Sequence, residues 1–233
     1  MPSNERPPVF DERGYNIEDP SDTRGLKTDY ITLLQTKALQ RYLPQGDGGV
    51  AVDIGCGYGR VSQVIQDAGW SVIGVDPDEK QIEYGRRNFA GVDFRVGKLP
   101  DLPLDDHSVD LMLMQNVIRI LQLMDELDAL KGFGRYLQAG ARVMVVDNVW
   151  KGNEKFVDEN WLVELFRDEG LELKSRVPIR AGRWWLLYMI RYGLVPRSRF
   201  DAIADYELKL RAQQPNLSSW RYFNVLFNFR RAD

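Results

Sequence analysis

Hydrophobic and polar residues along this chain follow two patterns: short apolar runs, and longer segments with apolar side chains at helical spacing. The apolar runs, interpreted as buried strands, lie at residues 50–54, 70–75, 93–97, 111–114 and 142–146. Helical spacing is clearest at residues 29–42 and 61–68, on either side of the first run. Because strands that alternate with helices build parallel sheets covered on both faces, the pattern predicts an α/β fold with a mostly parallel sheet.

The C-terminal third predicts two more strands with an insertion between them. Residues 160–169 have a helical apolar face, residues 171–179 alternate as a strand does, and residues 220–229 favour a strand strongly. Helix-like residues separate the last two runs. We therefore expect a seven-stranded sheet flanked by helices, with a helical cap, residues 181–217, inserted between the last two strands over the rim of the active site.

Composition supports one domain over residues 1–233, because 233 residues with 44% apolar content can bury a single sizeable α/β core. Residues 1–24 are polar and of mixed charge, which predicts a flexible N-terminal arm. The single cysteine excludes an intramolecular disulfide. No apolar run approaches the ~20 residues of a membrane span, so we expect a cytoplasmic protein.

The segment after the first strand is rich in glycine. Asp53 lies within that strand, and Gly55, Gly57 and Gly59 follow it, with the small residue Cys56 among them. Glycine permits positive φ angles and a close approach of the backbone to a ligand. The next helix begins at once, and its N-terminus offers free N–H groups. This strand, loop and helix predict a site for a nucleotide-like ligand.

The second strand ends in Asp76 and Pro77. A carboxylate has two accepting oxygens, which match the two neighbouring hydroxyls of a ribose. An Asp before a Pro also suits the N-cap of a helix, so Asp76 could instead begin the helix that follows. The two roles are compatible.

The G-x-G-x-G spacing, with an acid two residues ahead, resembles motif I of the class I S-adenosylmethionine (SAM) methyltransferases. Residues 102–110 are similar to the Leu-Pro-Phe-x-Asp-x-Ser-Phe-Asp stretch of that family, and residues 137–141 occupy the place of its Leu-Arg-Pro-Gly-Gly turn. The chain is therefore identified as a member. The resemblance implies a Rossmann-like fold, SAM as the methyl donor and S-adenosylhomocysteine (SAH) as the product.

The resemblance also implies where the cofactor binds. The corresponding residues here are Asp53, Gly55, Cys56, Gly57, Gly59, Arg60, Asp76, Pro77, Lys98, Leu99 and Gln115. It implies that Asp53 orients the loop, that the three glycines make room for the methionine moiety, that Asp76 accepts from the ribose hydroxyls, and that Gln115 reaches the amino-acid end. Lys98 stands where the family holds an acid against adenine. Either Asp101 or a backbone carbonyl replaces that acid, or the alignment is shifted by one residue.

Short motifs at residues 57–60, 114–118 and 145–148 are also similar to those of the protein α-N-terminal methyltransferases. This likeness implies that Arg60 pairs with the SAM carboxylate. It also implies that Asp147 acts as a base or orienter beside an incoming amine. Asp147 could equally end a strand in a turn. Asn116, at the edge of the fourth strand, is a further candidate on the substrate side.

Many small-molecule O-methyltransferases of this type carry a histidine shortly after the fourth strand. This chain has Arg119 there, and its one histidine, His107, falls in a turn where catalysis is not expected. Arginine cannot act as a base at neutral pH, but it binds carboxylate or phosphate well. Arg119 therefore either binds an anionic acceptor or lies on the solvent face of a helix.

Charge is distributed unevenly. Residues 174–200 hold no acid, although the whole chain has a net charge of −3. The basic residues in this stretch are Lys174, Arg176, Arg180, Arg183, Arg191, Arg197 and Arg199. Their mixture with aromatic residues predicts an anionic substrate or peripheral contact with an anionic membrane through residues 180–199; alternatively, they form the solvated rim of a packed helix. The pI of about 5.4 makes nucleic acid an improbable partner.

The sequence thus predicts a cytoplasmic SAM-dependent methyltransferase with no metal ion. We expect it to O-methylate an anionic small-molecule, lipid-linked or saccharide acceptor by in-line displacement, which requires chiefly that the two ligands be aligned. N-methylation of a peptide or protein amine is the first alternative, and SAM binding without catalysis is the second.

Overall fold

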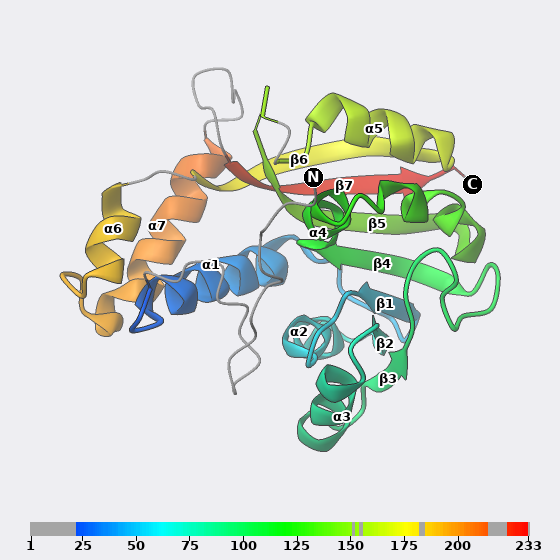
Figure 1. Cartoon of the computed structure of the whole chain (residues 1–233), viewed down its shortest axis with the longest axis horizontal. Helices are drawn as coiled ribbons and strands as arrows, with labels where there is room; N and C mark the ends of the chain where they lie inside the picture. The colour runs from blue at the N-terminus through cyan, green and yellow to red at the C-terminus, as the bar shows by residue number, and fades with distance from the viewer. Residues whose placement is uncertain (1–21, 151, 154–155, 182–184, 214–222, 233) are drawn as a thin grey trace.

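The computed structural model describes residues 22–150, 152–153, 156–181, 185–213 and 223–232. Its strands form one sheet in the order β3-β2-β1-β4-β5-β7-β6 (Figure 1). They are β1 (Val50–Ile54), β2 (Ser71–Asp76), β3 (Asp93–Val96), β4 (Val109–Gln115), β5 (Leu137–Val149), β6 (Leu171–Ala181) and β7 (Phe223–Arg231). The pairs among β1 to β5 are parallel, and β7 is antiparallel to both β5 and β6. The predicted seven-stranded, mostly parallel sheet is confirmed.

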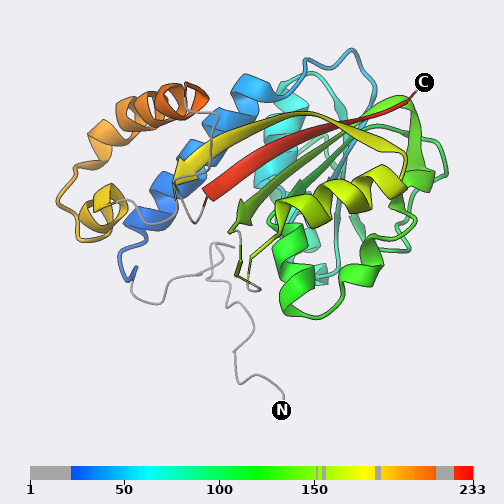
Figure 2. The same cartoon turned by 90° about the horizontal axis from the view of Figure 1, so that it is seen from above.

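Helices cover both faces of this sheet (Figures 1 and 2). They are α1 (Leu26–Tyr42), α2 (Arg60–Asp67), α3 (Glu79–Asn88), α4 (Val117–Leu123), α5 (Glu159–Asp168), α6 (Trp185–Arg191) and α7 (Phe200–Ala212), with short 3-10 turns at Leu127–Leu130, Phe133–Tyr136 and Arg197–Arg199. The core on one face joins α1, α2, α6 and α7, and the core on the other joins α4 and α5. None of the described helices is long and apolar enough to cross a bilayer.

The central strands are apolar on both sides because both of their faces are covered. In β4, Leu111 and Leu113 face the core that contains α1, whereas Met112 and Met114 face the core that contains α4. This two-sided burial explains why the central strands appear in the sequence as continuous apolar runs.

The insertion between β6 and β7 packs on α1. Leu186, Leu187 and Ile190 of α6 are buried in the same core as α1, and Phe200 of α7 meets Tyr30 edge to face, with ring centroids 5.6 Å apart. The sequence analysis expects a cap over the active-site rim. The helices of this insertion are present, and in its described part it packs against α1.

Three local predictions differ from the structure. Residues 1–21 of the expected arm lie outside the described residues. Asp22, however, is buried, and it accepts hydrogen bonds from the backbone N–H and the hydroxyl of Thr28, both at 2.8 Å, so the chain is anchored before residue 24. Residues 137–141, expected as a turn, begin β5 beside a register shift. Asp78, not Asp76, caps α3 through its side chain.

Candidate functional site

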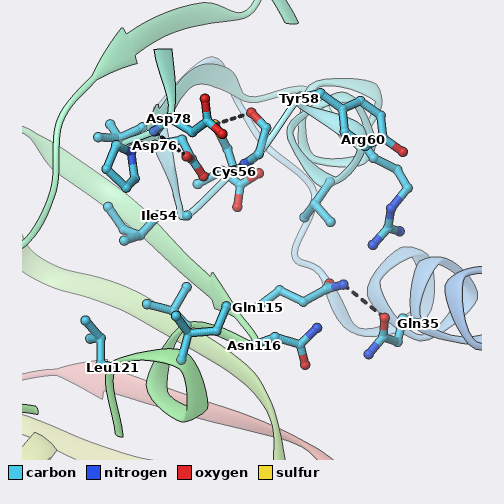
Figure 3. A pocket seen from close by; sticks show the side chains of 18 of the residues that line it. Gln35, Ile54, Cys56, Tyr58, Arg60, Asp76, Asp78, Gln115, Asn116 and Leu121 are labelled. Atoms are coloured by element: carbon cyan, nitrogen blue, oxygen red, sulfur yellow. Dashed lines mark hydrogen bonds between the residues drawn. The ribbon is translucent and has the colours of Figure 1, made fainter. Parts of the chain in front are cut away.

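A cavity of about 540 Å³ opens at the carboxyl ends of the parallel strands (Figure 3). Its glycine-loop end is lined by residues 53–58, 75–78 and 97–99. Its helix end is lined by Lys27, Thr28, Ile31, Thr32 and Gln35 of α1, with Asn148 of β5 and Arg180 of β6. Gln115 and Asn116 line it between these two ends, as Figure 3 shows. Switch points at strand ends are where ligands of open α/β sheets bind.

Asp76 holds the glycine loop to the end of β2. Its Oδ2 accepts from the backbone N–H of Gly57 at 2.8 Å, and its Oδ1 accepts from that of Asp78 at 2.9 Å. Burial raises the pKa of Asp76, although these two hydrogen bonds act in the opposite direction. The carboxylate lines the cavity, so it anchors the loop from the position where the sequence predicts ribose recognition.

Asp53 connects the loop to α2 from within the sheet. The hydroxyl of Ser62 donates to its Oδ2 at 2.7 Å, and the carboxyl is almost fully buried. Burial raises the pKa of Asp53 to about 7, and the hydrogen bond from Ser62 and the charge of Arg60 offset part of that rise. The contact with Ser62 fits the loop-orienting role that the sequence suggests.

The loop glycines have different surroundings. Gly57 has a φ of +54°, and a Cβ there would meet no atom closer than an oxygen of Gln81, 4.0 Å away. Gly57 therefore borders open space in which a ligand can approach the backbone. Gly59 has a φ of +101° and its Cβ would lie 2.3 Å from the Phe94 ring. It is not among the residues that line the cavity, and its missing side chain allows close packing against Phe94.

Two buried oxygens between the two ends fit a ligand with hydrogen-bond donors. The Oε1 of Gln115 and the Oδ1 of Asn116 are buried and have no hydrogen-bond partner within the described structure. Leaving a buried acceptor unsatisfied costs about 1–3 kcal/mol, which a donor on a ligand would recover. The ammonium group of SAM is such a donor. Together with the Gly57 backbone and the Asp76 carboxylate, these oxygens fit SAM.

Other residues predicted for the cofactor also line this cavity: Cys56, Arg60, Pro77, Lys98 and Leu99. Burial raises the pKa of the Cys56 thiol, which therefore stays protonated and acts as a small loop residue. Arg60 donates to the Thr36 hydroxyl of α1 at 3.1 Å. Asp101 pairs with Arg135 at 3.1 Å outside the cavity lining, so it does not supply the adenine acceptor that Lys98 lacks.

The structure does not bring Asp147 or Arg119 into the cavity lining. Asp147 is fully buried, and its Oδ2 accepts from the backbone N–H of Arg119 at 3.0 Å, in the first turn of α4. The Arg119 guanidinium lies 5.3 Å from the centroid of the Phe156 ring. Asp147 thus stabilises a helix start, whereas Asn116 does line the cavity. The ring of His107 approaches the carbonyl of Leu137, away from the cavity.

Sequence reasoning missed a row of polar side chains across three neighbouring strands. Asn148 of β5 pairs with Asn224 of β7, and Asn224 pairs with Arg180 of β6. Arg180 is only 5% exposed and lines the helix end of the cavity. The basic stretch in the sequence included Arg180, but nothing in the sequence separates it from its exposed neighbours.

Tyr30 of α1 and two charged residues of α7, Glu207 and Arg211, form a buried cluster in the same core. The Tyr30 hydroxyl donates to Glu207 at 2.8 Å, and the Nε of Arg211 lies 3.8 Å from the other Glu207 oxygen. Burial and Glu207 raise the pKa of Tyr30, while the charges of Arg180 and Arg211 lower it. Arg180 is therefore electrostatically part of this cluster. Within the described residues, no group of acids, cysteines and histidine could hold a metal ion.

Comparisons with known proteins match part of this chain to methyltransferases. Residues 52–145 match the family model of a methyltransferase domain. The chain is 34% identical over 106 residues to a probable S-adenosylmethionine-dependent methyltransferase of Mycolicibacterium smegmatis, covering 46% of this chain and 40% of that protein. It is 27% identical over 128 residues to an uncharacterized methyltransferase of Mycobacterium bovis, covering 55% and 51%. The chain thus spans about half, or less, of the length of these relatives.

A solved structure extends the likeness to the whole fold. Geranyl diphosphate C-methyltransferase from Streptomyces coelicolor A3(2), in complex with Mg²⁺, geranyl diphosphate and SAH, superimposes with a TM-score of 0.63 at 18% identity. The superposition covers 96% of this chain and 90% of that one. At this identity, the likeness concerns the fold.

Proposed function

Since this chain carries a class I, Rossmann-like SAM-dependent methyltransferase domain, we propose that it O-methylates an anionic small-molecule, lipid-linked or saccharide acceptor. We take residues 1–233 as one such domain. Bound SAM supplies an electrophilic methyl group on its sulfonium. The tasks of the protein are then to hold both ligands in line and to keep water away.

The glycine-loop end supports a definite arrangement of the cofactor. Asp76 accepts from the ribose hydroxyls, and the backbone at Gly57 borders the methionine moiety. Gln115 Oε1 accepts from the amino group, and Arg60 pairs with the carboxylate. This arrangement satisfies the buried oxygen of Gln115 and leaves the helix end of the cavity for the acceptor.

The position of Arg180 is the main support for an anionic acceptor. Arg180 is only 5% exposed and lines the helix end of the cavity, and Lys27 lines the same end. In a partly desolvated site, a guanidinium binds carboxylate or phosphate with two parallel hydrogen bonds. An acceptor oxygen that is already anionic needs no general base. The Streptomyces coelicolor structure contains geranyl diphosphate, so this fold can hold an anionic small molecule.

The test compares Arg180→Gln with Arg176→Gln, a control on the same strand whose exposed side chain pairs with Glu159. Acceptors are found by incubating the protein and SAM with cell-extract fractions separated by anion exchange, and by following SAH formation. For an acceptor so found, Arg180→Gln should lower kcat/KM about 10- to 100-fold, the scale of a lost hydrogen bond to a charged group. SAM affinity should stay within about twofold. Turnover confined to neutral or cationic fractions would refute an anionic acceptor.

N-methylation of a peptide or protein amine is less well supported. The sequence motif that suggested it gives Asp147 the role of a base or orienter beside the amine, whereas Asp147 is fully buried and accepts a hydrogen bond from the first turn of α4. SAM binding without catalysis remains the other alternative. It predicts that, in every extract fraction, SAH forms no faster with the protein than without it. The same screen therefore tests this alternative.

We also propose that the cap contacts an anionic membrane through residues 180–199. On α6, Leu186 and Ile190 face the core, while Trp185 is 63% and Tyr188 is 50% exposed. Arg191 lies over the Tyr188 ring at 5.4 Å. Exposed aromatic and basic side chains on one helix favour the interface of an anionic bilayer.

Vesicle sedimentation tests this contact. The protein should bind vesicles that contain phosphatidylserine more strongly than vesicles of phosphatidylcholine alone. Trp185→Ser should reduce that binding. Tyr84→Ser, an exposed aromatic on α3, serves as the control and should not reduce it. Equal binding by the Trp185→Ser variant would count against the contact.

A further inference from the structure

Four side-chain amides from four elements form one hydrogen-bonded chain beside the cavity. The Nε2 of Gln115 in β4 donates to the Oε1 of Gln35 in α1 at 3.1 Å, a link drawn in Figure 3. The Nε2 of Gln35 donates to the Oδ1 of Asn224 in β7 at 3.3 Å. The Nδ2 of Asn224 then donates to the Oδ1 of Asn148 in β5 at 3.2 Å. Gln35, Asn224 and Asn148 are all buried.

This chain has a direction. A side-chain amide has an oxygen that only accepts and a nitrogen that only donates. If the Gln115 amide turned over, its oxygen would meet the oxygen of Gln35, and a hydrogen bond would become a contact between two acceptors. Gln35 could turn as well only by presenting its oxygen to the oxygen of Asn224. No single amide can therefore turn without losing a hydrogen bond, and in this orientation of the row the Gln115 nitrogen faces Gln35.

The direction determines what the cavity offers to a ligand. With its nitrogen bound to Gln35, Gln115 presents its oxygen, and that oxygen is buried with no hydrogen-bond partner in the described structure. A ligand that contacts it must bring a donor. The α-amino group at the methionine end of the cofactor is a donor, whereas a carboxylate is not.

We propose that Gln35 and Asn224 are positioning residues, which turn the Gln115 oxygen toward the amino group of the cofactor. The inference rests on the cofactor arrangement of the proposed function, and it adds two residues from distant parts of the chain. Both act through Gln115. Asn224 is also paired across the sheet with Asn148 of β5 and Arg180 of β6, so the row of amides reaches the acceptor end of the cavity.

The test uses two probes that differ at one end. SAH and 5′-methylthioadenosine share the adenosine and the thioether sulfur, but only SAH has the amino-acid group. Calorimetric titration of the full chain compares wild type with Gln35→Met, which removes both hydrogen bonds of Gln35. We expect the dissociation constant for SAH to rise about tenfold, the lower end of the range for a hydrogen bond to a charged group. The constant for 5′-methylthioadenosine should stay the same.

Two further variants separate positioning from general damage. Gln35→Glu keeps an oxygen that accepts from Gln115 but loses the hydrogen bond that the Gln35 nitrogen donates to Asn224, so it should restore SAH binding only in part. Gln40→Met makes the same replacement at an exposed position of α1 and should affect neither probe. Equal weakening of both probes by Gln35→Met, or of neither, would overturn the proposal.

A double-mutant cycle separates action through Gln115 from direct contact, because Gln35 also lines the cavity. In a Gln115→Met background, Gln35→Met should weaken SAH binding no further. A second full loss would mean that Gln35 touches the cofactor itself, which contradicts the proposal. No acceptor is used, so failure to find an anionic acceptor leaves this test intact. Failure of the wild type to bind SAH at all would instead refute the proposed function.

Discussion

The two ends of the cavity are built in different ways. The glycine-loop end consists of residues 53–58, 75–78 and 97–99, each at the carboxyl end of a parallel strand. The helix end brings together side chains from α1, β5 and β6, with β7 behind them; Gln35 and Asn224, which share a hydrogen bond, are 189 positions apart. The first end depends on local backbone geometry, and the second depends on how distant elements pack.

Backbone geometry makes the glycine-loop end sensitive to very small changes. We expect the largest effect from Gly59→Ala. The new Cβ would lie 2.3 Å from the Phe94 ring, and that ring is also in close contact with Gly74 and Gly85 and cannot easily move away. Together with the positive φ, this clash should lower the free energy of unfolding by about 3 kcal/mol.

Urea denaturation measures that loss, and Gly48→Ala is its matched control. Gly48 also has a positive φ, +90°, but a Cβ there would meet nothing within 4 Å. The control should therefore lose only the backbone strain, about 1 kcal/mol. If the two variants are equally stable, the close approach of Phe94 is not what requires a glycine at position 59.

Asp76→Ala should give the next largest effect and should be confined to the cofactor. Removal of the carboxylate releases the backbone N–H of Gly57 and takes away the proposed ribose acceptor. SAM binding should weaken by about 1.5–3 kcal/mol, the range for hydrogen bonds to a charged group. Calorimetry measures this, with the exposed Asp93→Ala as the control. Unchanged SAM affinity would exclude Asp76 from the cofactor site.

The sequence predicted the glycine-loop end well because its signals are local. Strand, glycines and helix start follow one another within residues 50–67, and the acid at the end of β2 comes from the next strand in the chain. Each element's type follows from periodicity, and the parallel order brings the strand ends together. The exception is Gly59, whose close neighbour Phe94 belongs to another strand and is not visible in the loop sequence.

The helix end was predicted poorly, and Asp147 shows why. The sequence analysis ended the fifth strand at residue 146, whereas β5 continues to Val149. Because side chains alternate along a strand, the extra residues send Asp147 toward α4 and Asn148 toward Gln35 and Asn224. Gln35, Asn224 and Arg180 carry no local signal, since only the packing of α1 and the pairing of β6 with β7 gather them.

Ionisation of Asp53 should make cofactor binding at the glycine-loop end depend on pH. Burial raises its pKa to about 7, so near neutral pH the free protein holds this carboxyl partly protonated. A cationic ligand favours the carboxylate and lowers that pKa, so SAM binding releases a proton. Affinity for SAM should therefore increase as pH rises from about 6 to 8 and level off above, by roughly tenfold in all, since one pKa unit corresponds to 1.36 kcal/mol.

Calorimetric titration at pH 6, 7 and 8 measures this dependence. SAH serves as the comparison because it has the same amino-acid group but no sulfonium charge, so its affinity should change less. Asp53→Asn should remove the difference between the two ligands. Equal pH dependence for SAM and SAH in the wild type would mean that Asp53 does not respond to the sulfonium.

The smallest effect is expected for Arg119→Ala, which tests whether Arg119 belongs to the acceptor site. The sequence allows Arg119 to bind the acceptor, but its guanidinium lies over Phe156 and outside the cavity lining. The variant should lose about 0.5–1 kcal/mol of unfolding free energy with that cation–π contact. SAM affinity and the KM for an acceptor should stay within about twofold, in contrast to Arg180→Gln. A marked rise in acceptor KM would instead bring Arg119 into the acceptor site, and the anionic group would then lie between two arginines.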